Sequence, residues 1–195
     1  MDAGNWSFSG TIDFPSSYSG DNWDNPAWLE FQAFVTPDDE LKLLGRINSD
    51  PETTGYAGLV DVNSSTGAIT ANQRVRLPGG DKKFQINIRD GRLWTITNPN
   101  IYNVGLYTAS NSRNVAALYS SVDAINWQYH KRLIDNSSLD PTQYGDQYIS
   151  WEFDGDDIIM ATRTADENAN AAHNSNKIDF YRFTDWQDNW VGVGL

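Results

Sequence analysis

Residues whose types suit acid–base chemistry gather around one stretch of the sequence, residues 155–183. An apolar run there ends in Arg163, and a polar loop holding His173 follows it. Just before this stretch, Glu152 lies in an apolar segment. A loop histidine can act as a general base near pH 7, and a glutamate among core residues either meets an arginine or serves chemistry. His173 and Glu152 are therefore candidate catalytic residues.

The elements that must position these residues repeat along the chain. Each repeat has a strand, a tight turn rich in Asp, Gly or Pro, and a returning strand that ends in a polar residue; the three hairpins cover residues 31–50, 84–100 and 149–166. The turns TPDDE, RDGR and DGDD suit β-hairpins. A further strand follows each hairpin, and in the second repeat a fourth, NWQYHKRLI, follows that strand. We expect His130, in this last segment, at the surface of an outer strand.

Each repeat has the size and strand order of a β-propeller blade, a four-stranded antiparallel meander. The sequence predicts an all-β chain, a single unit over 1–195 that forms half of a six-bladed propeller, with blades at about 29–77, 83–134 and 147–183. The third blade lacks a fourth strand, which residues 5–14 are expected to supply, with the tail 189–195 as a rival. Three blades cannot close a ring at ordinary sheet twist. We therefore expect a homodimer that completes six blades, or a missing N-terminal half; an open β-sandwich fits the strand count but not the repeated hairpin register.

When the three hairpins are aligned, Arg46, Asn98 and Arg163 fall at equivalent positions, where the second strand of each repeat ends. Propeller ligands bind at one mouth of the central channel, so these side chains are expected to ring the same mouth. Two arginines there can hold a carboxylate, which suits an acidic sugar. The alternative is that each arginine pairs with a nearby aspartate, such as Asp50 or Asp166. Further candidate substrate-binding residues are Lys83, Asn100, Trp151 and Tyr102, the last of which either stacks on a sugar or anchors its loop.

Composition limits the partners. The 26 acidic and 14 basic residues give a net charge of −12, which argues against nucleic acid because phosphate binding needs a basic face. There are no cysteines, and no stretch approaches the roughly 18 apolar residues of a membrane span. The two histidines are far apart, and the turn DGDD is explained as a hairpin, so we expect no metal and no cofactor. The N-terminus MDAGNWSFSG does not read as a signal peptide; we expect a secreted or periplasmic protein whose signal is absent from this chain.

The segment SSVDAINW (120–127) matches S-x-D-x-x-x-W through Ser121, Asp123 and Trp127. This pattern resembles the Asp-box turn of sialidase-like propellers. The segments 77–100 and 148–183 are similar to the C-terminal half of bacterial sialidase-like (BNR-repeat) propeller proteins. In that family, a segment similar to PGG-x-x-KF leads to a hairpin ending in NP, and a DGDD hairpin reaches RTA and then a loop with Asn and His. The resemblance covers about residues 28–185.

The resemblance implies a glycan-active protein, either a glycoside hydrolase or a uronate-acting lyase. Retaining sialidases use a Tyr nucleophile, an acid pair and an arginine cluster, to which Arg46 and Arg163 would belong. Tyr181 stands where relatives are expected to have a histidine, and it joins the candidate catalytic residues. A complete set of Tyr and acid residues is not evident in the sequence. Two alternatives therefore stay open: a non-catalytic carbohydrate-binding propeller, and a half-propeller scaffold that assembles with itself.

Overall fold

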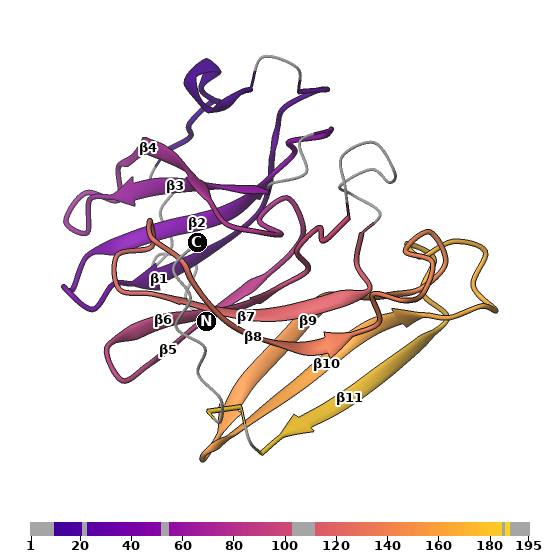
Figure 1. The fold of residues 1–195 in the computed structure, drawn as a ribbon. Helices are drawn as coiled ribbons and strands as arrows, with labels where there is room; N and C mark the ends of the chain where they lie inside the picture. Colours follow the sequence, from indigo (N-terminus) through magenta and orange to yellow (C-terminus); the bar gives the residue numbers. More distant parts are fainter. Residues whose placement is uncertain (1–9, 21–22, 52–54, 103–111, 185, 188–195) are drawn as a thin grey trace, which may run out of the picture.

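The computed structural model describes residues 10–20, 23–51, 55–102, 112–184 and 186–187. Apart from one short 3-10 helix, η2 (Ser16–Tyr18), the elements in these residues are β-strands. The strands form three antiparallel sheets (Figure 1), which confirms the prediction of an all-β chain. In this part of the chain, no helix has the length and apolarity that crossing a membrane requires.

Each sheet is a meander, in which strands adjacent in sequence are hydrogen-bonded neighbours. The first sheet contains β1 (Trp28–Val35), β2 (Leu41–Ile47), β3 (Tyr56–Val62) and β4 (Ile69–Arg76). The second contains β5 (Gln85–Arg89), β6 (Arg92–Thr97), β7 (Val115–Ser121) and β8 (Gln128–Asp135). The third contains β9 (Gly145–Asp154), β10 (Asp157–Ala165) and β11 (Lys177–Phe183).

The predicted turn chemistry closes the hairpins. Between β5 and β6, Asp90 and Gly91 have φ values of 52° and 68°, as a type I′ turn requires, and its twist matches that of the flanking strands. Between β9 and β10, Gly155 takes the positive φ of 61°. These two short turns fix the pairing register of the second and third hairpins, while the loop 36–40 joins β1 to β2. The cross-strand pair next to each hairpin connection gives a common reference for comparing the three sheets, although β1–β2 and β9–β10 each contain a register shift farther along.

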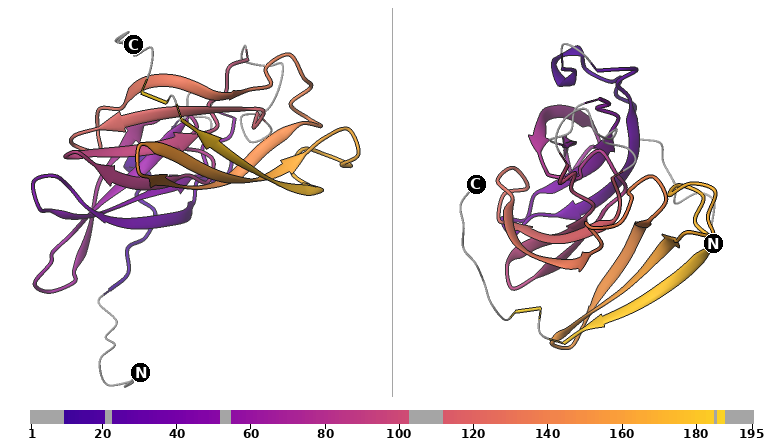
Figure 2. Two further views of the ribbon diagram at one scale, coloured as in Figure 1. Left: turned by 90° about the horizontal axis from the view of Figure 1, so that it is seen from below. Right: turned by 45° about the vertical axis from the view of Figure 1, so that its right-hand side comes forward.

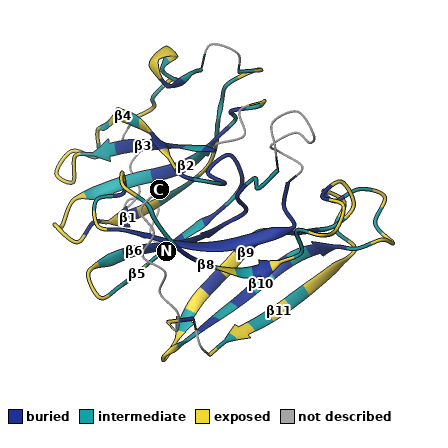
Figure 3. Ribbon diagram, viewed as in Figure 1, coloured by how far each residue is buried: buried dark blue, intermediate teal, exposed yellow. Residues whose placement is uncertain are grey.

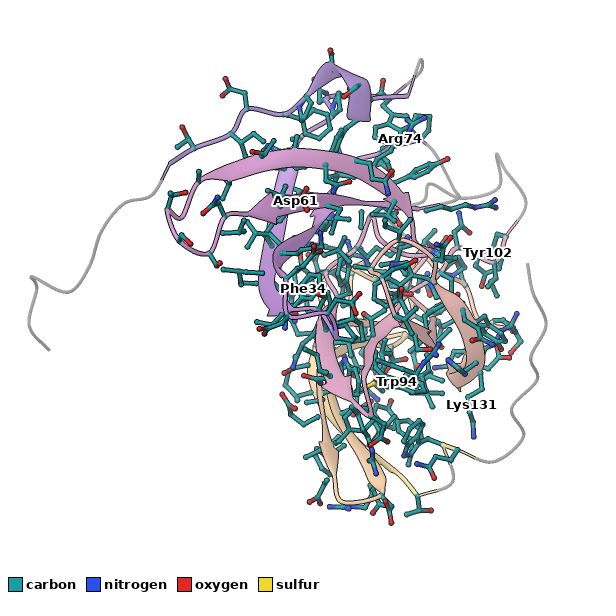
Figure 4. All side chains as sticks on the ribbon, turned by 90° about the vertical axis from the view of Figure 1, so that its left-hand side faces the viewer. Phe34, Asp61, Arg74, Trp94, Tyr102 and Lys131 are labelled. Carbon is teal, nitrogen blue, oxygen red and sulfur yellow. The ribbon has the colours of Figure 1, made fainter. Side chains whose placement is uncertain are left out.

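Two hydrophobic cores lie on the two faces of the second sheet. Figures 1 and 2 show how the three sheets are arranged. One core joins the second sheet to the first and includes Phe34 and Leu93; the other joins it to the third and includes Trp94 and Trp151. Figure 4 labels Phe34 and Trp94 in these two places. The second sheet is therefore a middle layer, with the first and third sheets on either side.

The first strands of the three sheets are joined by a repeated side-chain contact. Gln32 of β1 donates from Nε2 to the Ile86 carbonyl oxygen and accepts from the Ile86 N–H, both at 2.7 Å. Gln85 of β5 does the same to Trp151 of β9, at 2.9 Å and 3.3 Å. We call these contacts the amide clamps. Each one satisfies backbone groups that no neighbouring strand pairs, and so fixes one sheet against the next.

The Asp123 turn between β7 and β8 has the geometry that its sequence pattern predicts. Oδ1 of Asp123 accepts from the backbone N–H groups of Ile125 and Asn126, at 2.8 Å each, and from the hydroxyl of Ser121 at 2.9 Å. The Trp127 indole N–H donates to the Ala124 carbonyl oxygen, and its ring packs against the first core. Burial favours a higher pKa for Asp123, but the hydrogen bonds from Asn126, Ile125 and Ser121 outweigh burial and lower that pKa to about 2.

The expectation that His130 lies at the surface is wrong. Only 3% of this residue is exposed, and its Nε2 is 2.7 Å from the hydroxyl oxygen of Ser120. Its ring lies 4.8 Å from that of Trp94. Burial, together with the charge of Arg92, lowers the pKa of His130 to about 4. The imidazole is therefore neutral at pH 7.

Residues near the N-terminus lie against the first sheet. The Trp28 indole N–H donates to the Ile12 carbonyl oxygen at 3.2 Å, and the Tyr18 hydroxyl donates to the Leu59 carbonyl oxygen at 2.7 Å. The expected closing strand, 5–14, is described only from residue 10, and the rival tail 189–195 lies outside the described residues. Among the described residues, β11 is the outer strand of a three-stranded sheet.

Candidate anion-binding site

Strand pairing places Arg46, Asn98 and Arg163 at equivalent positions. Each lies the same number of residues beyond a cross-strand pair next to its hairpin turn; the three pairs are Val35–Leu41, Ile88–Leu93 and Phe153–Ile158. The antiparallel meanders carry these positions to the end of the sheets opposite the hairpin turns. Two of the three positions hold arginine, as the sequence alignment of the hairpins predicts.

A third arginine, Arg113, joins this group, although the sequence analysis did not identify it. It lies just before β7 and is 4% exposed. Its Nη1 donates to Oε1 of Gln147 at 2.6 Å. Burial lowers the pKa of Arg113, and the positive charge of Arg46 lowers it further. Arg113 and Arg46 are thus close enough to repel each other within the protein.

Tyr148 lies between two of the arginines. The guanidinium carbon of Arg163 is 4.8 Å from the centre of the Tyr148 ring, and that of Arg113 is 5.5 Å from it. Contacts of this kind attract the cation to the ring face. Tyr148 itself has a φ of 53°, a conformation that is uncommon for a non-glycine residue and costs free energy, as is typical of binding and active sites. The ring therefore orders two cations that would otherwise move apart.

His173 lies beside the same group. Arg163 donates from Nη2 to the His173 carbonyl oxygen at 3.2 Å, and the His173 ring lies 6.2 Å from that of Tyr148. Partial burial lowers the pKa of His173, and the charges of Arg113, Arg163 and Arg46 add to the effect. The exposed imidazole is consequently neutral at pH 7 and borders three guanidinium groups.

The loop that carries His173 is held in place through Gln147. This side chain accepts from Arg113 and donates from Nε2 to the Ala172 carbonyl oxygen and to the Ser175 hydroxyl. The Ala172 N–H donates to the Thr142 carbonyl oxygen at 2.7 Å. Gln147 is fully buried, so these bonds are shielded from water. A single buried amide thus connects Arg113 to the loop around His173.

Asn98 takes a supporting position and does not point into the group. It is 1% exposed, and its Nδ2 donates to the carbonyl oxygens of Val115 and Asp146 at 2.8 Å each. These two acceptors lie at the starts of β7 and β9, next to Arg113 and Gln147. From its aligned position we expected Asn98 at the mouth with the arginines; the structure shows it joining the segment that carries Arg113 to the segment that carries Gln147.

Lys83 adds a further cation near Arg46. Its Nζ donates to the Ile149 carbonyl oxygen at 2.8 Å, next to Tyr148. Burial lowers the pKa of Lys83, and the charge of Glu30 opposes that change. Glu30 also lies 3.4 Å from Nη1 of Arg46, whose Nε donates to the Asp81 carbonyl oxygen. The carboxylate of Asp81 is taken by Lys82 in a buried pair.

The site therefore has an excess of positive charge in an acidic chain. Three arginines and Lys83 lie near two carboxylates, Glu30 and Asp81, among the charge partners that the described residues provide, and Asp81 is already paired with the buried Lys82. The whole chain carries a net charge of −12. Clustered cations of this kind repel one another, and an anion bound between them relieves the repulsion. The alternative considered from sequence was that each arginine pairs with Asp50 or Asp166. Among the hydrogen bonds and ion pairs of the described residues, neither Arg46 nor Arg163 contacts either aspartate.

The two predicted residues of β9 lie away from this group. Trp151 is 1% exposed, and its indole N–H donates to the Gln85 carbonyl oxygen at 3.1 Å, so it faces the second core. Glu152 is on the opposite, exposed face, where its Oε1 accepts from Gln85. Neither places a ring or an acid beside His173.

Tyr102 and Asn100 hold their own loop together. The Tyr102 hydroxyl donates to the Ser137 carbonyl oxygen at 3.1 Å, and Nδ2 of Asn114 donates to the same hydroxyl oxygen. Oδ1 of Asn100 accepts from the Tyr102 N–H at 3.0 Å. Of the two roles considered for Tyr102, these contacts favour the loop anchor (Figure 4).

Tyr181 belongs to a second polar group, around Asp146. Its hydroxyl donates to Oδ1 of Asp146 at 3.0 Å. Burial raises the pKa of Tyr181, and the charge of Asp146 raises it further. The phenol lines a hollow of about 350 Å³ together with Tyr144 and Asp179. Tyr181 therefore stays protonated at neutral pH and is separate from the arginines.

Of the candidate residues, the structure brings together Arg46, Arg163, His173 and Lys83, and adds Arg113, Gln147 and Tyr148. The hairpin repeat provides no signal for the added residues, because Arg113 precedes β7 and because Gln147 and Tyr148 precede the aligned stretch 149–166. Among the described residues, no group of three or more His, Cys, Asp or Glu side chains is arranged to hold a metal ion. No protein-family model matches the chain, and no curated protein matches it either.

Proposed function

We propose that the three sheets are blades of half a six-bladed, sialidase-like β-propeller, and that the chain binds an acidic sugar between Arg46, Arg113 and Arg163. Two features support the propeller: the sheets repeat one meander, and their first strands β1, β5 and β9 lie side by side through the amide clamps. The excess of positive charge at one end of these sheets carries the sugar-binding proposal.

The ligand is defined by the chemistry of the site. A guanidinium binds a carboxylate through two parallel hydrogen bonds, and three guanidinium groups, two of them over the Tyr148 ring, provide donors from several directions. Tyr148 holds two of the guanidinium groups beside the ligand position, and the polar loop at His173 offers hydrogen bonds to hydroxyl groups. A uronic or sialic acid combines a carboxylate, a ring face and hydroxyls, and so fits better than a neutral sugar.

One observation favours a second candidate function, that of a uronate lyase. His173 is neutral at pH 7 beside the arginines that would neutralise a uronate carboxylate, which is the arrangement that proton abstraction next to that carboxylate requires. Hydrolysis through a tyrosine nucleophile has less support, since burial and then the charge of Asp146 raise the pKa of Tyr181 and keep it protonated. Formation of unsaturated product from a polyuronate, followed by ultraviolet absorbance and lost in His173→Gln, would establish the lyase.

Calorimetric titration with glucuronate-bearing oligosaccharides at low salt tests the binding proposal. Replacing Arg163 with glutamine removes one charged donor, and we expect the dissociation constant to rise about 10- to 100-fold, since such bonds contribute about 1.5–3 kcal/mol. The matched control is Arg132→Gln, which removes an equal charge from an exposed pair with Asp135 on β8. Equal weakening by both variants, or tighter binding of a neutral oligosaccharide, would contradict the proposal.

A further inference from the structure

The third sheet presents an edge and a face that the described residues leave uncovered. β7 of the second sheet pairs with β8, whereas no strand of the described chain pairs with the outer edge of β11. The pairings Leu93–Ser121 and Ile158–Phe183 show that Ser121 and Phe183 are equivalent. An open edge of this kind exposes backbone donors and acceptors to another strand.

The same equivalence shows what the uncovered face lacks. Ile178 and Phe180 of β11 correspond to Ala116 and Leu118 of β7. The β11 residues are 70% and 67% exposed, while the β7 residues are fully buried beneath the third sheet. In Figure 3, β7 is buried along its length and β11 is not. The third sheet covers this face of the second sheet. No described sheet covers the equivalent face of the third sheet.

A segment of the chain itself matches the missing strand. Residues 2–8, Asp-Ala-Gly-Asn-Trp-Ser-Phe, align with residues 123–129, Asp-Ala-Ile-Asn-Trp-Gln-Tyr, with the same Asp, Ala, Asn and Trp and an aromatic residue at the end. In 123–129 these residues make the Asp123 turn and begin β8. Residues 2–8 therefore carry the sequence of a turn followed by an outermost strand.

The aromatic ends of the two segments also find equivalent partners. Tyr129 of β8 pairs with Tyr119 of β7, and their ring centres are 5.7 Å apart. The residue of β11 equivalent to Tyr119 is Tyr181. Phe8, which corresponds to Tyr129, would therefore pack on Tyr181. The open edge of β11 thus provides an aromatic ring, that of Tyr181, against which Phe8 can pack.

Trp186, the described residue with contacts after β11, lies away from this edge. Three residues after β11, the Trp186 indole N–H donates to the Asp156 carbonyl oxygen at 2.7 Å, in the turn between β9 and β10. The Trp186 ring packs on Trp94 and Phe153, within the core between the second and third sheets. At Trp186 the described chain has thus crossed towards the turn between β9 and β10.

The described residues that follow this segment are bonded to the first sheet. Ile12 and Tyr18 are bonded to Trp28 and Leu59 of the first sheet, which lies across the second sheet from β11 (Figures 1 and 2). We propose that residues 2–9 add as a fourth strand to β11 of a second copy of the chain, and that the two copies exchange these strands reciprocally. The first sheet of one copy, with Leu29 and Val35 about two-fifths exposed, then covers Ile178 and Phe180 of the other.

Strand exchange also supplies contacts at the joint between copies, which is where the third sheet of one copy meets the first sheet of the other and where an amide clamp is absent. Gln32 and Gln85, which make the amide clamps, are equivalent to Ser150 in β9, and serine is too short to span to a neighbouring sheet. The joint between copies is therefore held by backbone pairing along β11 and by apolar contact. This inference deepens the proposed half-propeller and does not depend on sugar binding.

Disulfide trapping tests the exchange, because the chain has no cysteine of its own. Gln128 pairs with Ser120, so the equivalent pair across the joint is Ser7 with Arg182. Ser7→Cys and Arg182→Cys are made in separate chains, mixed and oxidised. We expect a covalent dimer from the mixture, and little from either variant alone. Ser7→Cys mixed with Phe180→Cys, which is out of register, is the matched control.

The outcomes distinguish each possibility. A disulfide that forms only when both cysteines are in one chain, and gives a product of monomer mass, would show that the segment pairs with its own β11 and overturn the exchange. Absence of any register-specific disulfide would overturn the strand addition altogether. In solution, the unaltered chain is expected at about twice 21.9 kDa, and a chain lacking residues 1–9 at the monomer mass. Sugar binding is scored separately on the arginine variants, so failure of one proposal does not obscure the other.

Discussion

Replacing Asp123 with asparagine should destabilise the protein by about 2 kcal/mol at pH 7. The hydrogen bonds of its turn lower the pKa of this carboxyl from 3.8 to about 2. Each unit of such a difference between folded and unfolded states corresponds to about 1.4 kcal/mol. Asparagine keeps the size of the side chain but loses the charge that strengthens the bonds from Ile125 and Asn126.

The pH dependence gives the sharper test. A carboxyl whose pKa is lowered by folding contributes its full stability above pH 3.8 and loses it as pH falls through 2. The difference between the unaltered protein and Asp123→Asn should therefore be about 2 kcal/mol at pH 7 and about half of that at pH 3. Urea unfolding followed by tryptophan fluorescence measures both values. Asp38→Asn, an exposed turn residue, is the control and should change stability by less than about 0.5 kcal/mol.

A difference below about 0.5 kcal/mol for Asp123→Asn at pH 7 would show that the carboxylate does not stabilise the turn as expected, as would a difference that does not shrink between pH 7 and pH 3. The first result would mean that the turn is held by Trp127 packing and not by the carboxylate. The second would mean that the charge is not the source of the stability. Either would also weaken the argument that residues 2–8 form a similar turn.

Three further predictions follow from buried polar groups. Because folding lowers the pKa of His130 to about 4, stability should fall by up to about 3 kcal/mol as pH drops from 6.5 towards 4, a loss that urea unfolding should find much reduced in His130→Gln. Gln85→Leu removes an amide clamp and leaves Trp151 backbone groups unpaired, so it should lower the free energy of unfolding by about 2–3 kcal/mol. The control, Lys131→Gln on β8, should lower it by less than about 0.5 kcal/mol. Equal effects of the two substitutions would contradict the role of the clamp. Asn98→Ala should weaken acidic-sugar binding without touching the ligand, and an unchanged calorimetric affinity would show that Asn98 does not position Arg113.

Turn chemistry is the reason that the strands and their pairing are predictable. RDGR and DGDD each place a residue able to adopt positive φ at the centre of a hairpin, and the alternating strands beside them fix the register. The register in turn makes Arg46 and Arg163 equivalent on the basis of their sequence positions alone. Which strands pack together is not determined by these local signals, because sheet packing depends on contacts such as Gln85 with Trp151, far apart in sequence.

The misjudged residues share one cause, the direction of a side chain at a given position. His130 has basic neighbours, but strand alternation turns it inward to Trp94. Asn98 aligns with two arginines, yet its short amide reaches the carbonyl oxygens of Val115 and Asp146. Arg113 precedes β7 in a segment that no repeat marks, and only the folded chain brings it next to Gln147. Such contacts depend on tertiary structure and have no local sequence signal.

The most direct test of the proposed acidic-sugar site is the pKa of His173, measured by NMR of the imidazole resonances with and without a glucuronate-bearing oligosaccharide. The chain has two histidines, and His130→Gln assigns the signals. Without ligand, the pKa of His173 should lie below the ordinary value of about 6.5, because of burial and three nearby guanidinium groups. A bound carboxylate offsets those charges, so the account predicts that the pKa of His173 rises on binding while that of His130 stays constant. A bound oligosaccharide that leaves the pKa of His173 unchanged would contradict the account.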